Sequence, residues 1–336
     1  MSPVELNEIF DEKKTISSIS ELLYLQEKTL KAPEKYKNPF YDYIKRYGIL
    51  ENYEERYVGT PDKLTDYFTE KVIGEKLEEY DKRLLQFFMI PCTPANESGL
   101  LYVNGLKLFE EDKDFFDPRR ILKKEENELS KVINHSLGSR GPESVARAWI
   151  ENSKKLVEEY DGDPKNIFHY GMHPREAFRR VKNFREFGNK NAALFLKEMI
   201  ESGAYDPGES RRYTPIPADI HVMRFTIRTS SRDRKKTIET LNGMTHQKLA
   251  REIQTYLMNI TSEAPIIDPI KADDAIWIWE KEKCSRKKCN RCPVKECSNE
   301  IIVTHQHHES GDRIGKRNGK IIVTHDKNMK LDYFGD

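Results

Sequence analysis

The stretch FREFGNKNAALFLKEM at residues 184–199, together with PIPADIHVMRF at residues 215–225, decides the fold of this chain. A tight turn is expected at Gly188, and Lys190 just after it opens a helix whose apolar residues can face a core. Asp219 opens the next helix, shortly after two prolines. Backbone N–H groups at a helix start bind phosphate without reading sequence. The stretch therefore predicts an amine and a carboxylate at two helix starts. The start that follows the Gly188 turn is suited to binding a phosphate group.

These two strings resemble the helix-hairpin-helix DNA glycosylase superfamily (HhH-GPD), in its endonuclease III-like iron-sulfur branch. In that family a hairpin of the form LPGxGxKTA precedes a VDTH-like string, and a Lys and an Asp from them carry the chemistry. Lys190 and Asp219 fall on those positions, whereas Arg185 and Glu186 stand where the family has its Pro and first Gly. The resemblance implies an all-α, two-lobed glycosylase core.

Amphipathic segments dominate the remainder of the chain. SSISELLYLQEKTLKA (residues 17–32) follows a Ser cap, and PESVARAWIENSKKLVEEY (residues 142–160) forms a long helix that ends at DGDP. The string IIVTH occurs twice near the end, on either side of an Asn-Gly turn, which predicts a small β-hairpin. The expected organisation is an N-terminal helical extension at 1–79, a glycosylase core at 80–283, an iron-sulfur cluster loop at 284–300 and a β-hairpin tail at 301–336.

Composition indicates a globular chain with a nucleic-acid partner. At 336 residues, 37% hydrophobic and 34% charged, the sequence suits one large or two moderate domains. It contains no apolar run long enough for a bilayer and no signal-peptide pattern at its start, so we expect an intracellular protein, cytoplasmic or nucleoid-associated. The net charge of +1 hides an uneven distribution: residues 175–236 carry 15 Lys and Arg against 8 Asp and Glu. Local positive charge favours a phosphate backbone.

Four of the five cysteines follow the pattern C-x4-C-x2-C-x4-C, at Cys284, Cys289, Cys292 and Cys297. Such a group predicts a metal site, and its spacing alone leaves zinc and a 4Fe-4S cluster open. The resemblance implies a 4Fe-4S cluster, because the family carries its cluster loop at this place after an aromatic helix. The loop and the hairpin are the expected DNA contacts, through Phe187, Gly188, Asn189, Arg286, Lys287, Lys288 and Arg291.

The resemblance assigns the chemistry to Lys190 and Asp219. A carboxylate near C1′ stabilises the cation-like sugar that forms when an N-glycosidic bond breaks. A neutral Lys amine can attack C1′ and form a Schiff base, which permits strand cleavage at the abasic site. The expected function is therefore a base-excision-repair DNA glycosylase with AP lyase activity. A monofunctional glycosylase and a noncatalytic helix-hairpin-helix nucleic-acid-binding protein are the alternatives.

The target base of such an enzyme must be flipped into a pocket of aromatic and amide side chains. We expect this base pocket to draw on Gln86, Phe88, Asn96, Arg140 and His221. These residue types leave the lesion open among oxidised, deaminated and alkylated bases. The expected partner is double-stranded damaged DNA. We expect the protein to act as a monomer and not to bind a membrane.

Overall fold

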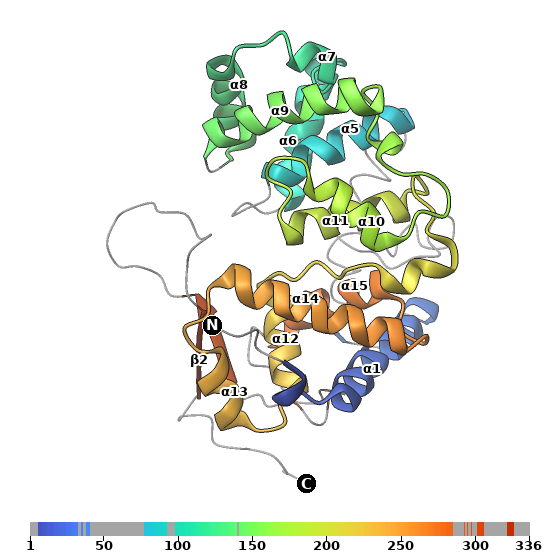
Figure 1. The fold of residues 1–336 in the computed structure, drawn as a ribbon, viewed down its shortest axis with the longest axis vertical. Helices are drawn as coiled ribbons and strands as arrows, with labels where there is room; N and C mark the ends of the chain where they lie inside the picture. Colours follow the sequence, from blue (N-terminus) through green and yellow to red (C-terminus); the bar gives the residue numbers. More distant parts are fainter. Residues whose placement is uncertain are drawn as a thin grey trace. The chain divides into compact units, whose positions relative to one another are not determined.

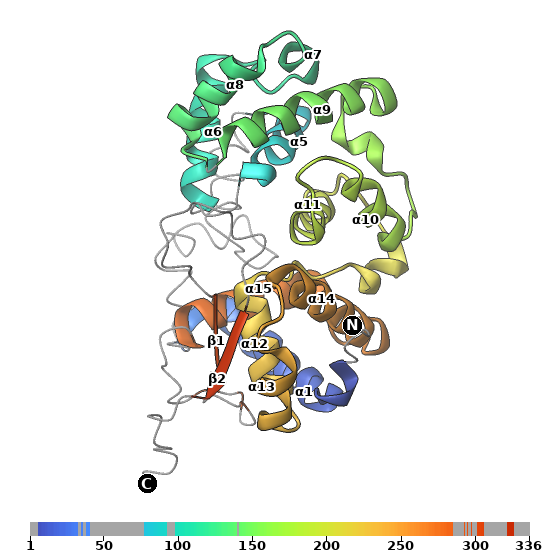
Figure 2. The same ribbon diagram turned by 60° about the vertical axis from the view of Figure 1, so that its left-hand side comes forward.

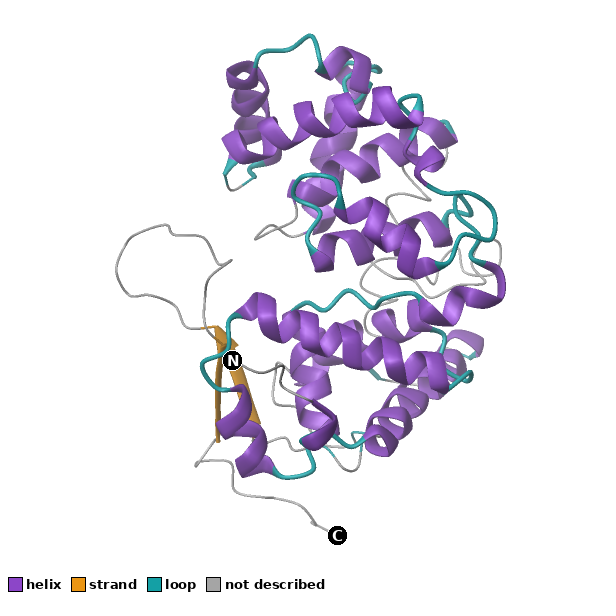
Figure 3. Cartoon of the chain, viewed as in Figure 1, coloured by secondary structure: helices purple, strands orange, loops and turns teal. Residues whose placement is uncertain are grey.

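The computed structural model describes residues 6–32, 35, 38–40, 77–92, 98–139, 141–284, 292, 294, 297, 301–305 and 321–325. Contacts divide the chain into two compact units. The terminal unit comprises Met1–Tyr43 with Ala218–Asp336, and the middle unit comprises Ile44–Pro217. Both are built mostly from helices, which confirms the helical expectation (Figures 1 and 3). The expected domain ranges, with cuts after residues 79, 283 and 300, stay a prediction.

The described part of the middle unit consists of helices joined by turns and loops. Its elements are α5 (Glu79–Met89), η5 (Ile90–Cys92), α6 (Ser98–Glu111), α7 (Pro118–Ile121), α8 (Glu126–Val132), the π-helical turn η6 (Ile133–Leu137), α9 (Pro142–Tyr160), η7 (Pro164–Ile167), α10 (Pro174–Lys182), α11 (Asn189–Glu201) and η8 (Gly208–Tyr213). The long helix α9 packs against α7 and α8, while α10 and α11 pack together (Figure 1). The predicted helix at residues 142–160 is confirmed, and it ends at Asp161 in a left-handed conformation.

An aromatic core holds the middle unit together. Trp149 on α9 is fully buried, and its indole N–H donates to the Phe88 carbonyl on α5 at 2.9 Å. Phe87 contacts Phe184 and Phe187, with ring centroids 5.1 and 5.0 Å away. Each aromatic pair contributes about 0.5–1.5 kcal/mol beyond area burial. The core therefore anchors both ends of the turn that precedes α11.

The terminal unit joins the start of the chain to its last third. It comprises η1 (Leu6–Glu8), α1 (Glu12–Lys31), α12 (Ile220–Ser230), α13 (Arg234–Leu241), α14 (His246–Glu263), α15 (Pro269–Trp279), the π-helical turn η9 (Glu280–Cys284), β1 (Ile301–His305) and β2 (Ile321–His325). Helix α12 packs against α1, α14 and α15 (Figure 2). Its buried position makes α12 the centre of this unit.

Helix α1 starts earlier than the sequence suggests. The Asp11 carboxylate accepts from Lys14 N and caps a helix that begins at Glu12, so the expected Ser cap is wrong. Thr15, within the first turn, donates to the Ser230 hydroxyl at 2.6 Å, and Asp11 N donates to the Ser230 carbonyl at 2.7 Å. The Asp11 cap therefore accounts for the earlier start, and the first turn of α1 contacts the end of α12.

The two IIVTH strings form an antiparallel strand pair. Val303 pairs with Val323, and Ile301 pairs with His325. The Asn-Gly turn expected between them lies outside the described residues. Among the helices that the structure describes, none is both long and apolar enough to cross a membrane.

Candidate functional site

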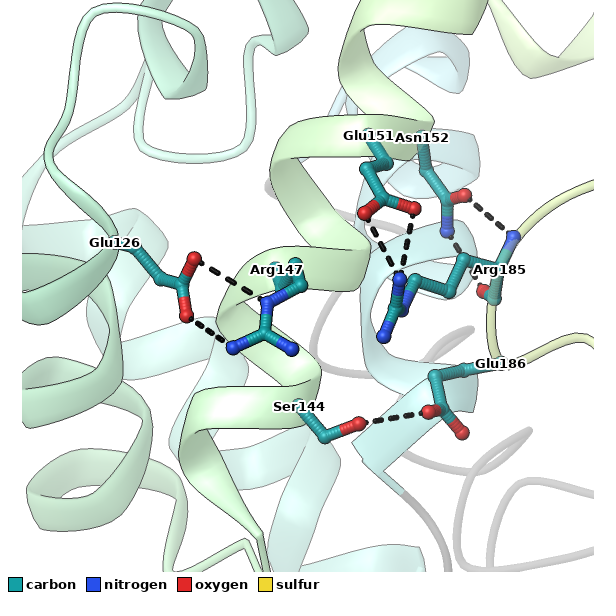
Figure 4. Close-up of polar contacts among 7 residues, drawn as sticks. All are labelled: Glu126, Ser144, Arg147, Glu151, Asn152, Arg185 and Glu186. Carbon is teal, nitrogen blue, oxygen red and sulfur yellow. Dashed lines mark hydrogen bonds and ion pairs between the residues drawn. The ribbon is translucent and has the colours of Figure 1, made fainter.

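Glu186 adopts a left-handed conformation in the turn before α11. Its φ is +67°, a region that glycine enters freely and that costs another residue about 1–2 kcal/mol. Two side chains hold it there. Ser144 on α9 donates to Glu186 Oε1 at 2.8 Å (Figure 4). Asn191 Nδ2 donates to the Glu186 carbonyl at 2.9 Å. The turn thus has the backbone that a glycine would supply, although a carboxylate occupies the position.

Arg185, the preceding residue, is fixed to the same face of α9. Its backbone N–H donates to Asn152 Oδ1 at 2.7 Å, and its carbonyl accepts from Asn152 Nδ2 at 3.0 Å. The guanidinium contacts both carboxylate oxygens of Glu151, at 2.9 and 3.1 Å (Figure 4). A further ion pair, between Arg147 and Glu126, joins α9 to α8. The turn is therefore positioned by α9 through backbone as well as side-chain contacts.

The start of α11 carries Lys190. Gly188 is the N-cap residue and is exposed, and Asn189 and Lys190 are the first two residues of the helix, both half-buried. Gly188 has no side chain with which to cap the helix, which suits a helix start that would bind an anion. Phe187, by contrast, is 2% exposed and stacks on Phe87. Its ring is a core anchor, so any DNA contact at this residue would have to come from its backbone.

Asp219 is the N-cap of α12, as the sequence predicts. Its Oδ1 accepts from the backbone N–H groups of His221 and Val222 at 2.8 and 2.9 Å. Oδ2 accepts no hydrogen bond from the part of the chain that the structure describes. The side chain is half-buried. Lys190 belongs to the middle unit and Asp219 to the terminal unit.

One stripe of α12 converges on a buried carboxylate. His221, Arg224 and Arg228 follow the i, i+3, i+7 spacing of one helix face. All three contact Glu280, the first residue of η9, whose side chain is 0% exposed. Sequence reasoning missed Glu280. The only signal was a single acidic residue directly after the apolar run AIWIW.

Three of the four pattern cysteines line one pocket. Cys284, Cys292 and Cys297 face a space of about 220 Å³, which includes solvent at its mouth; the other lining residues are Phe225, Arg228, Thr229, Trp279 and Val294. Burial, followed by the two neighbouring thiols, raises the pKa of Cys284 well above its usual range. Cys289 lies outside the described residues, and no three described His, Cys, Asp or Glu side chains lie close enough together to hold a metal ion.

The donor set of this pocket nevertheless fits a thiolate-bound metal. Thiolates are the protein ligands of iron-sulfur clusters and of structural zinc. The indole Nε1 of Trp279, which lines the pocket, is buried and has no hydrogen-bond partner in the described part of the chain. A buried N–H without an acceptor costs about 1–3 kcal/mol, and a cluster sulfur or a ligand thiolate would supply an acceptor. The cationic loop residues Arg286, Lys287, Lys288 and Arg291 lie outside the described residues.

The expected base-pocket residues have different environments. Gln86 is 4% exposed and its amide donates to Glu198 Oε2 at 3.2 Å, whereas Phe88 is fully buried in the aromatic core. The Gln86 amide oxygen is buried and has no hydrogen-bond partner among the described residues. Asn96 and Arg140 lie outside the described residues. His221 is 22% exposed and sits two residues after Asp219.

Comparison with known proteins gives a likeness in structure but none in sequence. No protein-family model matches the chain, and no curated protein matches its sequence. Among solved structures, the chain is similar to a trapped endonuclease III–DNA covalent intermediate in its estranged-adenine complex, with a TM-score of 0.45 and 16% identity over 70% of this chain and 93% of that chain. Membership of the helix-hairpin-helix superfamily therefore stays a prediction.

Proposed function

We propose that this chain is a base-excision-repair DNA glycosylase with AP lyase activity, which acts as a monomer on a damaged base in double-stranded DNA. The observation that carries the proposal is the arrangement of Asp219. Two backbone N–H groups hold Oδ1, while Oδ2 accepts no hydrogen bond from the described residues. A carboxylate fixed in this way at a helix start has one oxygen oriented by the protein and one left for a ligand.

Asp219 would stabilise the sugar as the base departs. Breaking an N-glycosidic bond leaves the electron pair on the base and positive charge on the sugar ring. A carboxylate already fixed near C1′ stabilises that charge without having to reorganise, and such preorganised charges make large contributions to catalysis. In this proposal Oδ2 faces the sugar, and the two backbone donors keep the side chain in place.

Lys190 would supply the lyase step. Its neutral amine attacks C1′, a C–N bond forms as the bond to the base breaks, and the departing base takes up a proton. The nitrogen lone pair then forms the C=N bond as the C1′–O4′ bond of the sugar ring breaks, and the ring oxygen takes up the proton that the nitrogen has lost. The product is a Schiff base, from which the strand can be cleaved on the 3′ side. The backbone N–H groups that follow Gly188 would bind a phosphate of the same strand. Basic residues of the cysteine loop would add contacts that carry no sequence information.

Cys284, Cys289, Cys292 and Cys297 would hold a 4Fe-4S cluster, with a single zinc ion as the alternative. When bound, the cluster would fix the fold of the loop, since base excision itself needs no electron transfer. Three of these thiols line the pocket described above, and the Trp279 N–H beside them lacks an acceptor among the described residues. The pocket wall also includes Phe225 of α12, which would connect the loop to the helix that Asp219 caps.

Borohydride trapping on duplexes with an abasic site or a damaged base tests the proposal. The wild-type chain should form a covalent adduct, and Lys190→Ala should lose it. Lys182→Ala, which removes an exposed lysine at the end of α10, is the matched control and should keep the adduct. Asp219→Asn should release base at least about 100-fold more slowly while α12 keeps its cap, because Asn caps helices as well as Asp does.

Two other outcomes would replace this proposal. Free base released without strand cleavage, lost in Asp219→Asn but kept in Lys190→Ala, would indicate a monofunctional glycosylase. Salt-sensitive DNA binding without product on any damaged duplex would indicate a noncatalytic binding protein. The second alternative is favoured by one observation: the carboxylate of Glu186 stands in the turn that would receive the phosphate, and like charges repel.

A further inference from the structure

Glu280 is a buried carboxylate with an unusual set of neighbours. Its side chain is 0% exposed, and it begins the π-helical turn that runs to Cys284. Oε1 lies 3.7 Å from Arg228 Nη1 and 4.0 Å from Arg224 Nη1, and Oε2 is hydrogen-bonded to His221 Nδ1. Oε1 accepts no hydrogen bond within the described residues. The carboxylate is thus held by charge on one oxygen and by an imidazole on the other.

The cost of burying this carboxylate argues for a role beyond packing. An ion loses several kcal/mol of solvation in a protein interior, and only well-placed partners offset the loss. Here the two guanidiniums provide opposite charge but stand at 3.7 and 4.0 Å, which is too long for a hydrogen bond. The close contact is the one with His221, 59 residues away in sequence. An apolar residue at position 280 would fill the space without this cost, so the carboxylate is best explained by what it does to the imidazole.

The contact with Glu280 determines which ring nitrogen of His221 carries the proton and donates a hydrogen bond. In a neutral imidazole one ring nitrogen carries the proton and the other has a free lone pair. A carboxylate against Nδ1 places the proton on Nδ1, so Nε2 becomes a hydrogen-bond acceptor. Trp277 packs against the ring in an edge-on arrangement, with centroids 5.8 Å apart, and restricts its rotation. The ring is still 22% exposed, so a ligand can reach it.

His221 is also tied to the Asp219 cap. Its backbone N–H donates to Asp219 Oδ1, so the two side chains leave the same first turn of α12. We propose that Glu280 is a positioning residue that holds His221 in the Nδ1–H form, and that His221 Nε2 accepts a hydrogen bond from an N–H or O–H group of the ligand bound at Asp219. The identity of that ligand, an everted nucleotide, rests on the proposed function. The tautomer of His221 in the free protein does not depend on the proposed function.

This arrangement has a consequence for the choice of ligand. A site that offers a hydrogen-bond acceptor favours ligands that have an N–H or O–H group to donate. It rejects an analogue without such a donor, because the acceptor of the site would then be buried without a partner. At the reacting sugar, the donors are the attacking water or amine and the nitrogen of a pyrrolidine that mimics the charged sugar. Asp219 would contribute negative charge, and His221 would orient the ligand through the hydrogen bond that Nε2 accepts.

Nitrogen-15 NMR of the histidine rings, recorded on the full-length chain at pH 8, tests the positioning role. The chain has nine histidines, and the signals that vanish in His221→Asn belong to His221. They should show a protonated Nδ1 and an unprotonated Nε2. Glu280→Gln, whose amide oxygen can still accept, should keep this pattern, whereas Glu280→Met should move the proton to Nε2, the form that an unrestrained imidazole prefers. A wild-type signal from the Nε2–H form or from an imidazolium would overturn the proposal.

Ligand binding tests the second half. A duplex that carries a pyrrolidine abasic-site analogue is added while its binding is followed by fluorescence anisotropy. The His221 Nε2 signal should move toward the hydrogen-bonded position in the wild type and in Glu280→Gln, and Glu280→Met should bind the duplex about tenfold more weakly. Binding with an unchanged Nε2 signal would overturn the acceptor role. A duplex that fails to bind at all would contradict the proposed function instead, and the tautomer of the free protein would still decide the role of Glu280.

Discussion

The Ser144 hydroxyl on α9 donates a 2.8 Å hydrogen bond to Oε1 of Glu186, across 42 residues of sequence. This bond holds a side chain whose own backbone is left-handed, at φ +67°. Residues in that region persist only where their surroundings determine them, and they concentrate at functional sites. The turn before α11 is therefore maintained by anchors on α9, in a chain that lacks the glycine its conformation would favour.

Replacing Glu186 should reverse the usual order of Ala and Gly. Glu186→Ala loses the Ser144 bond and keeps the backbone strain, whereas Glu186→Gly loses the bond and relieves the strain. We expect the Gly variant to be more stable than the Ala variant by about 1 kcal/mol in urea unfolding. Glu158, exposed on α9, is the matched control, and there Gly should be less stable than Ala by about 1 kcal/mol. The same order at both sites would contradict the assigned strain.

Asn152 should matter far more to the turn than its neighbour Glu151. Asn152 is 2% exposed and satisfies both backbone groups of Arg185, so Asn152→Ala leaves two polar groups without partners. We expect a loss of about 2–3 kcal/mol in the free energy of unfolding, measured by urea denaturation. Glu151→Ala removes an ion pair that is largely exposed and should cost less than about 1 kcal/mol. Equal losses would show that the turn does not depend on the buried amide.

Elements with strong local signals could be predicted from the sequence. Apolar periodicity and a turn at DGDP give the limits of α9, and the carboxylate of Asp219 caps α12 where the sequence places a helix start. The three described cysteines of the pattern line one pocket, although their metal stays a prediction. Each of these features is encoded within about twenty residues, so spacing and capping chemistry suffice to find it.

Features that depend on distant residues escaped prediction. The Ser pair at the start of SSISELLYLQEKTLKA is a good local cap, but α1 begins at Glu12, where Asp11 caps it and Thr15 in its first turn is hydrogen-bonded to Ser230. A left-handed Glu186 has no local signature, since Ser144 determines it from another helix. The bond between His221 and Glu280 joins two strings that look unrelated in sequence. In each case a tertiary contact that the sequence does not reveal accompanies the unexpected feature.

Removing a described cysteine should abolish metal binding. Anaerobically purified wild type should be brown, with about four irons per chain, if the cluster is present. Cys292→Ala and Cys297→Ala should each lose the visible absorbance and most of the iron, because each removes a pocket thiol. Cys92→Ala is the control: this thiol lies in the middle unit and should leave the iron unchanged. A colourless protein with one zinc would support the alternative metal, and iron retained in Cys292→Ala would remove this thiol from the site.

Cys92 should make the stability of the chain fall at alkaline pH. The residue is 0% exposed, and burial raises the pKa of its thiol well above the ordinary range. In the unfolded chain the thiol loses its proton above pH ~8.5, while the folded chain retains it. The unfolded state then binds fewer protons, so the free energy of unfolding decreases by up to about 1.4 kcal/mol per pH unit as pH rises.

The difference between wild type and Cys92→Ala isolates this effect. Tyr205 and Tyr256, whose pKa values burial also raises, titrate in both proteins and cancel in the comparison. Between pH 7 and pH 10 the wild type should lose about 2 kcal/mol more than Cys92→Ala in urea unfolding with reductant present. Below pH 8 the difference between the two proteins should be constant, because both states keep the thiol protonated there. A constant difference across the whole range would mean that the folded protein exposes this thiol to deprotonation, in conflict with its burial beside the Phe88 carbonyl.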